Sequence, residues 1–85
     1  MNMTFRNKLL NLPNKTFFVL YKNEKYLVTK NIIASNGIAK LYAINLRNKD
    51  IVSCNYFVNI KNGLLKPCEM SSKKVIDFVN NLILL

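Results

Sequence analysis

The chain has 85 residues, of which 51% are hydrophobic and 20% are charged, with only two glycines and two prolines. This length supports a single hydrophobic core within one domain over residues 1–85, and the composition excludes a disordered chain, which is too polar to bury a core. Thirteen Lys and Arg against four Asp and Glu give a formal net charge of +9, which favours a polyanion or an acidic protein as partner.

The N-terminal segment 1–14 has apolar residues at roughly helical spacing, namely Phe5, Leu9 and Leu12. Pro13 follows them, and its ring both blocks a helical hydrogen bond and disfavours helical geometry in the residue before it. We therefore expect a short helix in this segment, ending before the proline.

Strand-forming residues dominate positions 16–33, with a polar gap at 22–25 that is short enough for a hairpin. Asn36-Gly37 then lies between two apolar runs, and this pair favours a hairpin because both residues tolerate positive φ. The next strand is expected over 38–47. One face of that strand carries Lys40, Tyr42, Ile44 and Leu46.

The cleanest alternation in the chain predicts a strand over 52–60, with one buried face and one mostly solvated face. Asn62-Gly63 repeats the hairpin signal and leads into a short apolar run at 64–66. A proline follows and ends the sheet, because it cannot donate to a central ladder. The sheet as a whole is expected over residues 15–66.

The C-terminal segment 71–84 predicts an amphipathic helix that starts behind the candidate caps Ser71 and Ser72. Its apolar arc covers about half of the circumference, which is enough to pack on the sheet and also to offer a margin to a partner. The stripe consists of Val75, Ile76, Val79, Leu82 and Ile83.

No catalytic, cofactor or metal site can be assembled from this sequence, so we expect a binding protein and not an enzyme. The chain has no His, and both glycines stand alone after an Asn instead of forming a phosphate loop. Cys54 and Cys68 are too few for a disulfide framework or a zinc site and are expected to be small, buried or half-buried residues. The four carboxylates are scattered, at Glu24, Asp50, Glu69 and Asp77.

Two stretches resemble a chromo-type domain, and the closer likeness is to the chromo shadow domain of heterochromatin proteins. They are the strand Tyr42-Ala43-Ile44-Asn45-Leu46-Arg47-Asn48 after the Asn36-Gly37 turn, and the helix phrase Val75-Ile76-Asp77-Phe78. The likeness spans roughly residues 28–83. It implies an α+β fold with a small, antiparallel, strongly curved sheet of three to five strands, chromo- or SH3-like, and a C-terminal amphipathic helix.

The same resemblance implies a function. Chromo shadow domains dimerise through the final helix, and their dimer groove binds hydrophobic peptides of partner proteins in the nucleus. Leu46 stands where chromo-type strands usually carry Trp, which argues against a methyl-lysine cage. A homodimer needs a self-complementary apolar patch, and the wide helical arc supplies one independently. The implied interface residues are Val75, Ile76, Val79, Asn80, Ile83 and Leu84.

Two other hypotheses remain open. The chain could be a basic small β-barrel that binds RNA or DNA, with possible contacts at Lys22, Lys25, Lys30 and Lys40. It could also be a small phage or mobile-element inhibitor that docks on a host protein. Fourteen asparagines and eleven lysines indicate a biased coding sequence, which makes a protein basic without a selected contact.

We expect an intracellular protein, cytoplasmic unless the chromo shadow resemblance places it in the nucleus. No apolar run approaches the roughly 18 residues that span a bilayer, so no membrane partner is expected. The N-terminus is too polar to open a secretory signal.

Overall fold

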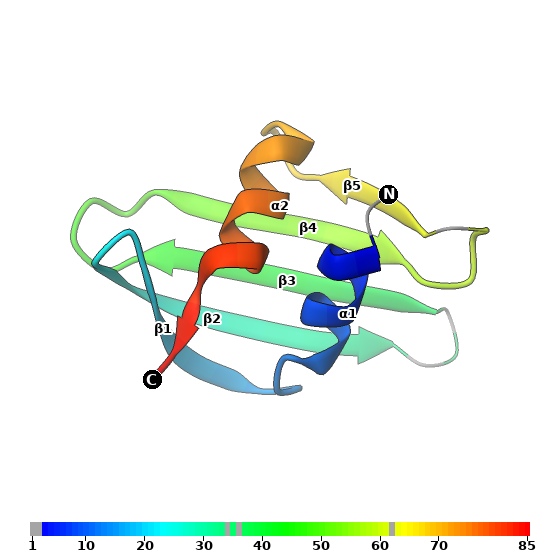
Figure 1. The fold of residues 1–85 in the computed structure, drawn as a ribbon, viewed down its shortest axis with the longest axis horizontal. Coiled ribbons are helices and arrows are strands. Elements are labelled where there is room, and N and C mark those ends of the chain that lie inside the picture. Colours follow the sequence, from blue (N-terminus) through cyan, green and yellow to red (C-terminus); the bar gives the residue numbers. More distant parts are fainter. Residues whose placement is uncertain (1–2, 34, 36, 62) are drawn as a thin grey trace.

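The computed structural model describes residues 3–33, 35, 37–61 and 63–85, and places two helices against one six-stranded antiparallel sheet (Figure 1). The strands lie in the order β5-β4-β3-β2-β1-β6. In chain order the elements are α1 (Met3–Asn11), β1 (Thr16–Tyr21), β2 (Glu24–Ile33), β3 (Ile38–Asn45), β4 (Ile51–Phe57), β5 (Leu64–Pro67), α2 (Ser72–Asn81) and β6 (Ile83–Leu84).

The expectation of a strongly curved, chromo- or SH3-like sheet of three to five strands is wrong. The sheet has six strands and is neither closed nor strongly curled, and an N-terminal helix accompanies the C-terminal one. A small sheet curls tightly through bulges or through glycines inside its strands. Here the paired registers run without a break, and Gly37 and Gly63 both lie outside the strands, so the sheet stays open.

The two Asn-Gly signals fall next to strands, but Asn36 and Asn62 lie outside the described residues. Gly37 and Gly63 have φ of 61° and 74°, which is the left-handed backbone that such turns require. The strand expected over 52–60 ends earlier, at Phe57.

The predicted C-terminal helix is correct at its start and too long at its end. Ser71 caps α2, because its hydroxyl oxygen accepts a backbone N–H of the first turn at 3.1 Å. The helix ends at Asn81, and Leu82 is extended, with φ −66° and ψ 154°. The chain then turns onto β1 and forms β6, which covers part of an otherwise open strand edge.

The core lies between the helices and one face of the sheet. α1 and α2 both pack on this covered face (Figure 1), and in the described part of the chain no helix is long and apolar enough to cross a membrane. Phe5 meets Tyr56 edge-on with ring centroids 5.7 Å apart, and Phe78 meets Tyr21 at 5.0 Å. Each large side chain buried in this way contributes about 1.5–3 kcal/mol to folding.

Candidate functional site

The second face of the sheet carries no helix. The alternation of side chains along each strand separates the two faces, so that Leu41 and Ala43 of β3 are buried under the helices while Tyr42 points away from them. We call the uncovered side the open face. Its strand residues include Phe18, Leu20, Lys25, Leu27, Thr29, Asn31, Lys40, Tyr42, Ile44, Ile51, Ser53, Asn55, Phe57 and Lys66.

The strand register arranges these side chains in rows that cross the sheet. An apolar row contains Phe18, Leu27, Ile44 and Ile51. The neighbouring row contains Thr16, Thr29, Tyr42 and Ser53. The next row is polar and basic, and contains Asn31, Lys40, Asn55 and Lys66. Neighbouring strands lie about 4.8 Å apart, so the side chains of one row are in reach of a single extended ligand.

The charges on the open face have one sign. Lys25, Lys40 and Lys66 occupy its strand positions, and none of the four carboxylates of the chain does. Three of these acids have polar partners: Glu24 binds Arg47, Asp50 binds Lys74 at 2.9 Å, and Asp77 accepts a hydrogen bond from the Tyr21 hydroxyl group. Glu69 follows β5, and Glu69 and Asp50 both lie at the margin of the open face, near Tyr42.

Tyr42 stands between two hollows at one side of the open face. Its side chain is 47% exposed. The first hollow, about 280 Å³, is here called the Lys40 hollow, and its polar lining includes Thr29, Asn31 and Asn55. The second hollow, about 440 Å³, is called the Met70 hollow and is lined by residues that include Lys49, Asp50, Ile51, Glu69, Met70 and Lys74. Both hollows share Tyr42, Ser53 and Cys68 as a common wall.

Phe18 is the other strongly exposed ring of the open face, at 44%. The Lys25 ammonium group lies 4.4 Å from its ring centroid, in a cation–π arrangement. This contact occupies one face of the ring, whereas no cation–π or ring contact is recorded for Tyr42 among the described residues.

The four lysines predicted as nucleic-acid contacts are separated by the fold. Lys25 and Lys40 share the open face. Lys22 lies on the other side, beside Lys73 and Ser71 near the start of α2. Lys30 is fully buried, and burial lowers the pKa of its ammonium group.

Sequence reasoning missed Lys66, Asn31 and Asn55, which complete the basic row. The alternation along each strand shows in the sequence which face each residue occupies. The sequence does not show that these residues lie side by side, because that depends on the registers between β2, β3, β4 and β5. The Asn-Gly turns indicated which strands form hairpins without fixing which residues lie opposite each other.

The residues predicted for a dimer or partner interface also take different positions. Val75 and Val79 are buried, and Ile76 packs against the same core. Asn80 is half-buried, and its backbone carbonyl accepts a hydrogen bond from Lys8. Ile83 and Leu84 are exposed in β6, at 62% and 52%. The helical stripe is therefore used by the core of the chain itself, and the tail remains accessible.

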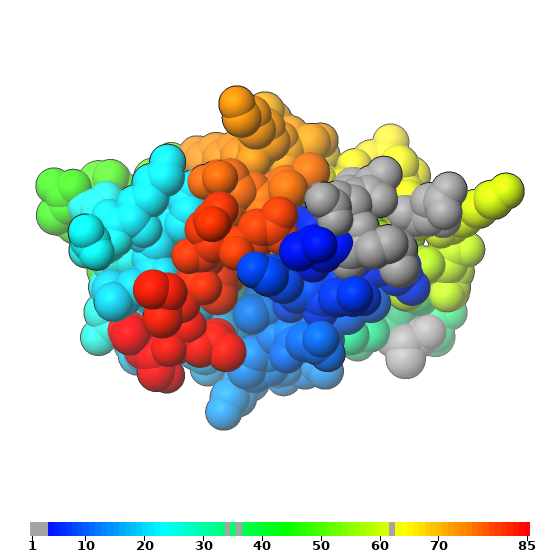
Figure 2. Space-filling model, in the orientation of Figure 1, coloured from blue at the N-terminus to red at the C-terminus, as the bar shows by residue number. Residues whose placement is uncertain are grey.

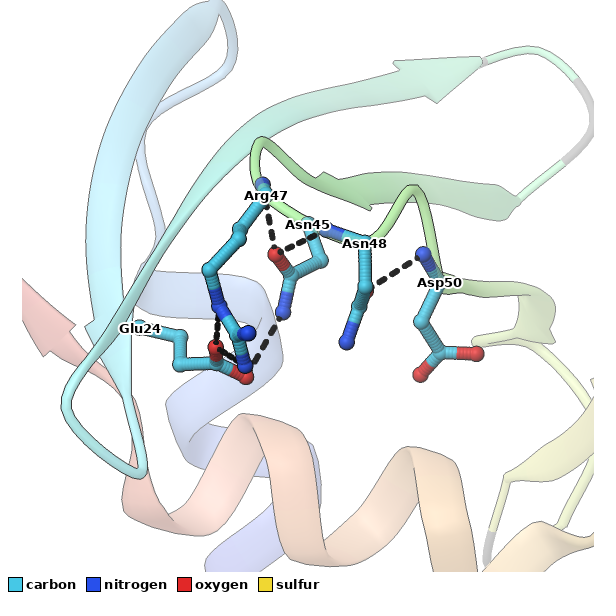
Figure 3. Close-up of polar contacts among 5 residues, drawn as sticks. All are labelled: Glu24, Asn45, Arg47, Asn48 and Asp50. Atoms are coloured by element: carbon cyan, nitrogen blue, oxygen red, sulfur yellow. Dashed lines mark hydrogen bonds and ion pairs between the residues drawn. The ribbon is translucent and has the colours of Figure 1, made fainter.

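A cluster of hydrogen-bonded polar side chains lies at the turn between β3 and β4 (Figure 3). The buried Asn45 accepts the backbone N–H groups of Arg47 and Asn48 and donates to Glu24. Hydrogen bonds from Arg47 and then from Asn45 lower the pKa of Glu24. The bonds from Arg47 and Asn48 hold the turn itself, and the bonds to Glu24 tie it to the start of β2, so we interpret the cluster as structural.

The two cysteines are both free. Cys54 is buried, and burial followed by the nearby Cys68 raises its pKa to about 12, so its thiol stays protonated at neutral pH. Within the described ranges, Cys, Asp and Glu side chains do not gather in threes to hold a metal ion.

No family model matches this chain, and no curated protein or solved structure matches it. The resemblance to the chromo shadow domain therefore depends on the sequence phrases alone. The homodimer and the peptide groove that it implies stay predictions.

Proposed function

We propose that this protein binds single-stranded nucleic acid on the open face of its sheet. The observation that carries the proposal is a combination of three features of this face: three lysines at its strand positions, no carboxylate at those positions, and an accessible tyrosine ring between two hollows. Lysines attract the phosphates, and an exposed ring offers a surface on which a base can stack.

The charge of the open face favours an anionic ligand over a second copy of the chain. If two copies met face to face, Lys25, Lys40 and Lys66 would approach identical lysines with no acid opposite them. Like charges brought together in an interface cost several kcal/mol. A polyanion would instead be attracted by the three lysines.

The accessible ring favours a single strand over a duplex. Bases in a duplex are stacked on each other and hide their faces, whereas an unpaired base can stack on Tyr42, which is exposed on an open sheet. Stacking of this kind contributes about 1–3 kcal/mol per base and tolerates any sequence. The amide and hydroxyl groups of Asn31, Asn55 and Thr29 are close enough to bond to the edge of such a base.

Fluorescence anisotropy with labelled single-stranded DNA and RNA of about twelve nucleotides tests the proposal, because this length exceeds the face of one sheet. The dissociation constant should rise steeply with salt, and RNA and DNA titrations show which sugar is preferred. The double variant Lys40→Glu/Lys66→Glu should weaken binding at least tenfold. The matched control Lys22→Glu/Lys73→Glu changes the net charge equally on the covered side and should weaken binding much less.

Two results would contradict the proposal. One is the absence of binding to both oligonucleotides at low salt. The other is an equal loss from the two double variants, because the attraction would then come from net charge and not from the open face.

A second candidate function is self-association through the C-terminal tail, residues 82–85. Ile83, Leu84 and Leu85 are 62%, 52% and 66% exposed. Figure 2 shows this tail in red on the surface beside the blue N-terminal region, and a hollow of about 340 Å³ lies between Leu12, Val79 and Leu84. The tail of one copy can therefore dock in the hollow of a second copy, and the same contact repeats in reverse across a two-fold axis.

Sedimentation at two protein concentrations tests this second candidate. The wild type should gain mass with concentration, and Ile83→Glu should remain monomeric because a charge would be desolvated in the contact. Ile60→Glu is the matched control, since Ile60 is 51% exposed and lies away from the tail, after β4. A wild type that is monomeric at both concentrations rejects the candidate.

A further inference from the structure

We infer that the ring of Tyr42 inserts between two successive bases of the bound strand, so that the Lys40 hollow and the Met70 hollow each receive one base. This inference rests on the proposed function. It adds which part of the ligand the open face recognises, namely one pair of adjacent bases. The hollows lie on the two sides of one wall, and Tyr42 is the exposed ring in that wall.

The strand register shows why the two hollows lie on opposite sides of the ring. Tyr42 of β3 lies directly opposite Ser53 of β4. Along these strands, Lys40 and Asn55 form the next open-face pair on one side, and Ile44 and Ile51 form it on the other. The Lys40 hollow includes the first pair, and the Met70 hollow includes Ile51.

The side chains that line the two hollows can contact a base while the phosphates of the same nucleotide stay near solvent. The Lys40 hollow offers amide and hydroxyl groups from Asn31, Asn55 and Thr29, which can donate to and accept from a base edge. The Met70 hollow offers the apolar side chains of Ile51 and Met70 for contact with a base face. Its lining also includes the carboxylates of Asp50 and Glu69, of which Asp50 is paired with Lys74 at 2.9 Å. Each hollow also has a lysine in its lining, Lys40 in one and Lys49 in the other, so an ammonium group is available for the phosphate on either side.

Phe18 provides a matched comparison on the same face. Its exposed fraction, 44%, is close to the 47% of Tyr42. However, the Lys25 ammonium group lies over its ring, and Phe18 lines neither hollow. The inference therefore assigns insertion to Tyr42 and excludes it for Phe18.

The experiment uses a single-stranded octanucleotide with two adjacent 2-aminopurine bases at its centre. Two stacked 2-aminopurines give a coupled circular-dichroism band, and a ring placed between them removes this coupling. The wild-type protein and Phe18→Leu should both remove the band on saturation. Tyr42→Leu should leave the band and weaken binding at least tenfold. Tyr42→Phe should act like the wild type within about threefold, because stacking needs the ring and not the hydroxyl.

The outcomes separate the inference from the proposed function. If the wild-type protein binds the octanucleotide but the coupled band persists at saturation, insertion is wrong while binding to the open face stands. If Phe18→Leu weakens binding as much as Tyr42→Leu does, the assignment to Tyr42 is also wrong. If the wild type does not bind the octanucleotide at all, the proposed function fails together with the inference. The wild-type spectrum decides the main point without any variant.

Discussion

The ammonium group of Lys30 donates a hydrogen bond to the backbone carbonyl oxygen of Leu12 over 2.8 Å, inside the core. A second hydrogen bond, of 3.0 Å, reaches the carbonyl oxygen of Leu10. Carbonyls at the end of a helix have no intrahelical partner, and here a side chain from β2 satisfies two of them. The lysine thus connects the end of α1 to the sheet, at the cost of burying a cation.

Replacement of Lys30 by Met should lower the free energy of unfolding by about 2 kcal/mol. The variant leaves the Leu10 and Leu12 carbonyls without their donor, and the relief of charge burial offsets only part of that loss. Urea unfolding measures the change. Lys73→Met, at an exposed position, should stay within about 0.5 kcal/mol of the wild type. A Lys30→Met variant as stable as the wild type would show that the capping role is wrong.

The period of two along the strands made the faces of the sheet predictable from the sequence. Lys40, Tyr42 and Ile44 do share one face, and Val52 and Cys54 are buried on the other. The sequence could not show that both helices would cover the same face, since this depends on contacts between distant segments. The open face therefore became visible only in the structure.

In the C-terminal tail, the local sequence pattern predicts the wrong element. Leu82 and Ile83 continue the apolar spacing of α2, so the local pattern predicts a longer helix. The structure ends the helix at Asn81 because Ile83 and Leu84 pair with β1 instead. Pairing with the unpaired backbone groups at the edge of β1 outweighs the local helical preference here. The sequence of the tail does not indicate which strand lies beside it.

Asn45 should contribute more to stability than its neighbour Asn48, although both bind backbone N–H groups of the same turn (Figure 3). Asn45 is fully buried, accepts two backbone N–H groups and donates to Glu24. The Asn48 side chain is exposed and accepts one N–H, from Asp50. We expect Asn45→Ala to lower the free energy of unfolding by about 2–3 kcal/mol, and Asn48→Ala by less than about 1 kcal/mol. Equal losses in urea unfolding would contradict the ranking.

Tyr21 should make the protein sensitive to alkaline pH. Burial, and then the hydrogen bond to Asp77, raise the pKa of Tyr21 from 10.0 to about 12. The folded chain therefore holds the phenolic proton more tightly than the unfolded chain, and this stabilisation is complete below about pH 10 and is lost as the pH rises towards about 12.

The comparison of the wild type with Tyr21→Phe isolates this effect, because all other titrating groups are common to both proteins. The wild type should be the more stable of the two near neutral pH, and the difference in urea midpoint should stay constant up to about pH 10 and shrink between about pH 10 and about pH 12. A difference that stays constant over this interval would mean that the Tyr21 proton does not contribute.

Gly63 and Gly37 should differ in their tolerance of a methyl group, although both have positive φ. A Cβ at Gly63 would lie 1.7 Å from the hydroxyl oxygen of Tyr56, which is fully buried against Phe5 and cannot retreat without opening the core. A Cβ at Gly37 would lie 2.2 Å from the amide nitrogen of Asn59, an exposed side chain that can swing away. The backbone strain, about 1–2 kcal/mol, is similar at both positions.

Gly63→Ala should therefore lower the free energy of unfolding by about 2 kcal/mol more than Gly37→Ala, measured by urea denaturation. Equal losses at the two glycines would indicate that backbone strain alone sets the cost and that Tyr56 yields to the methyl group.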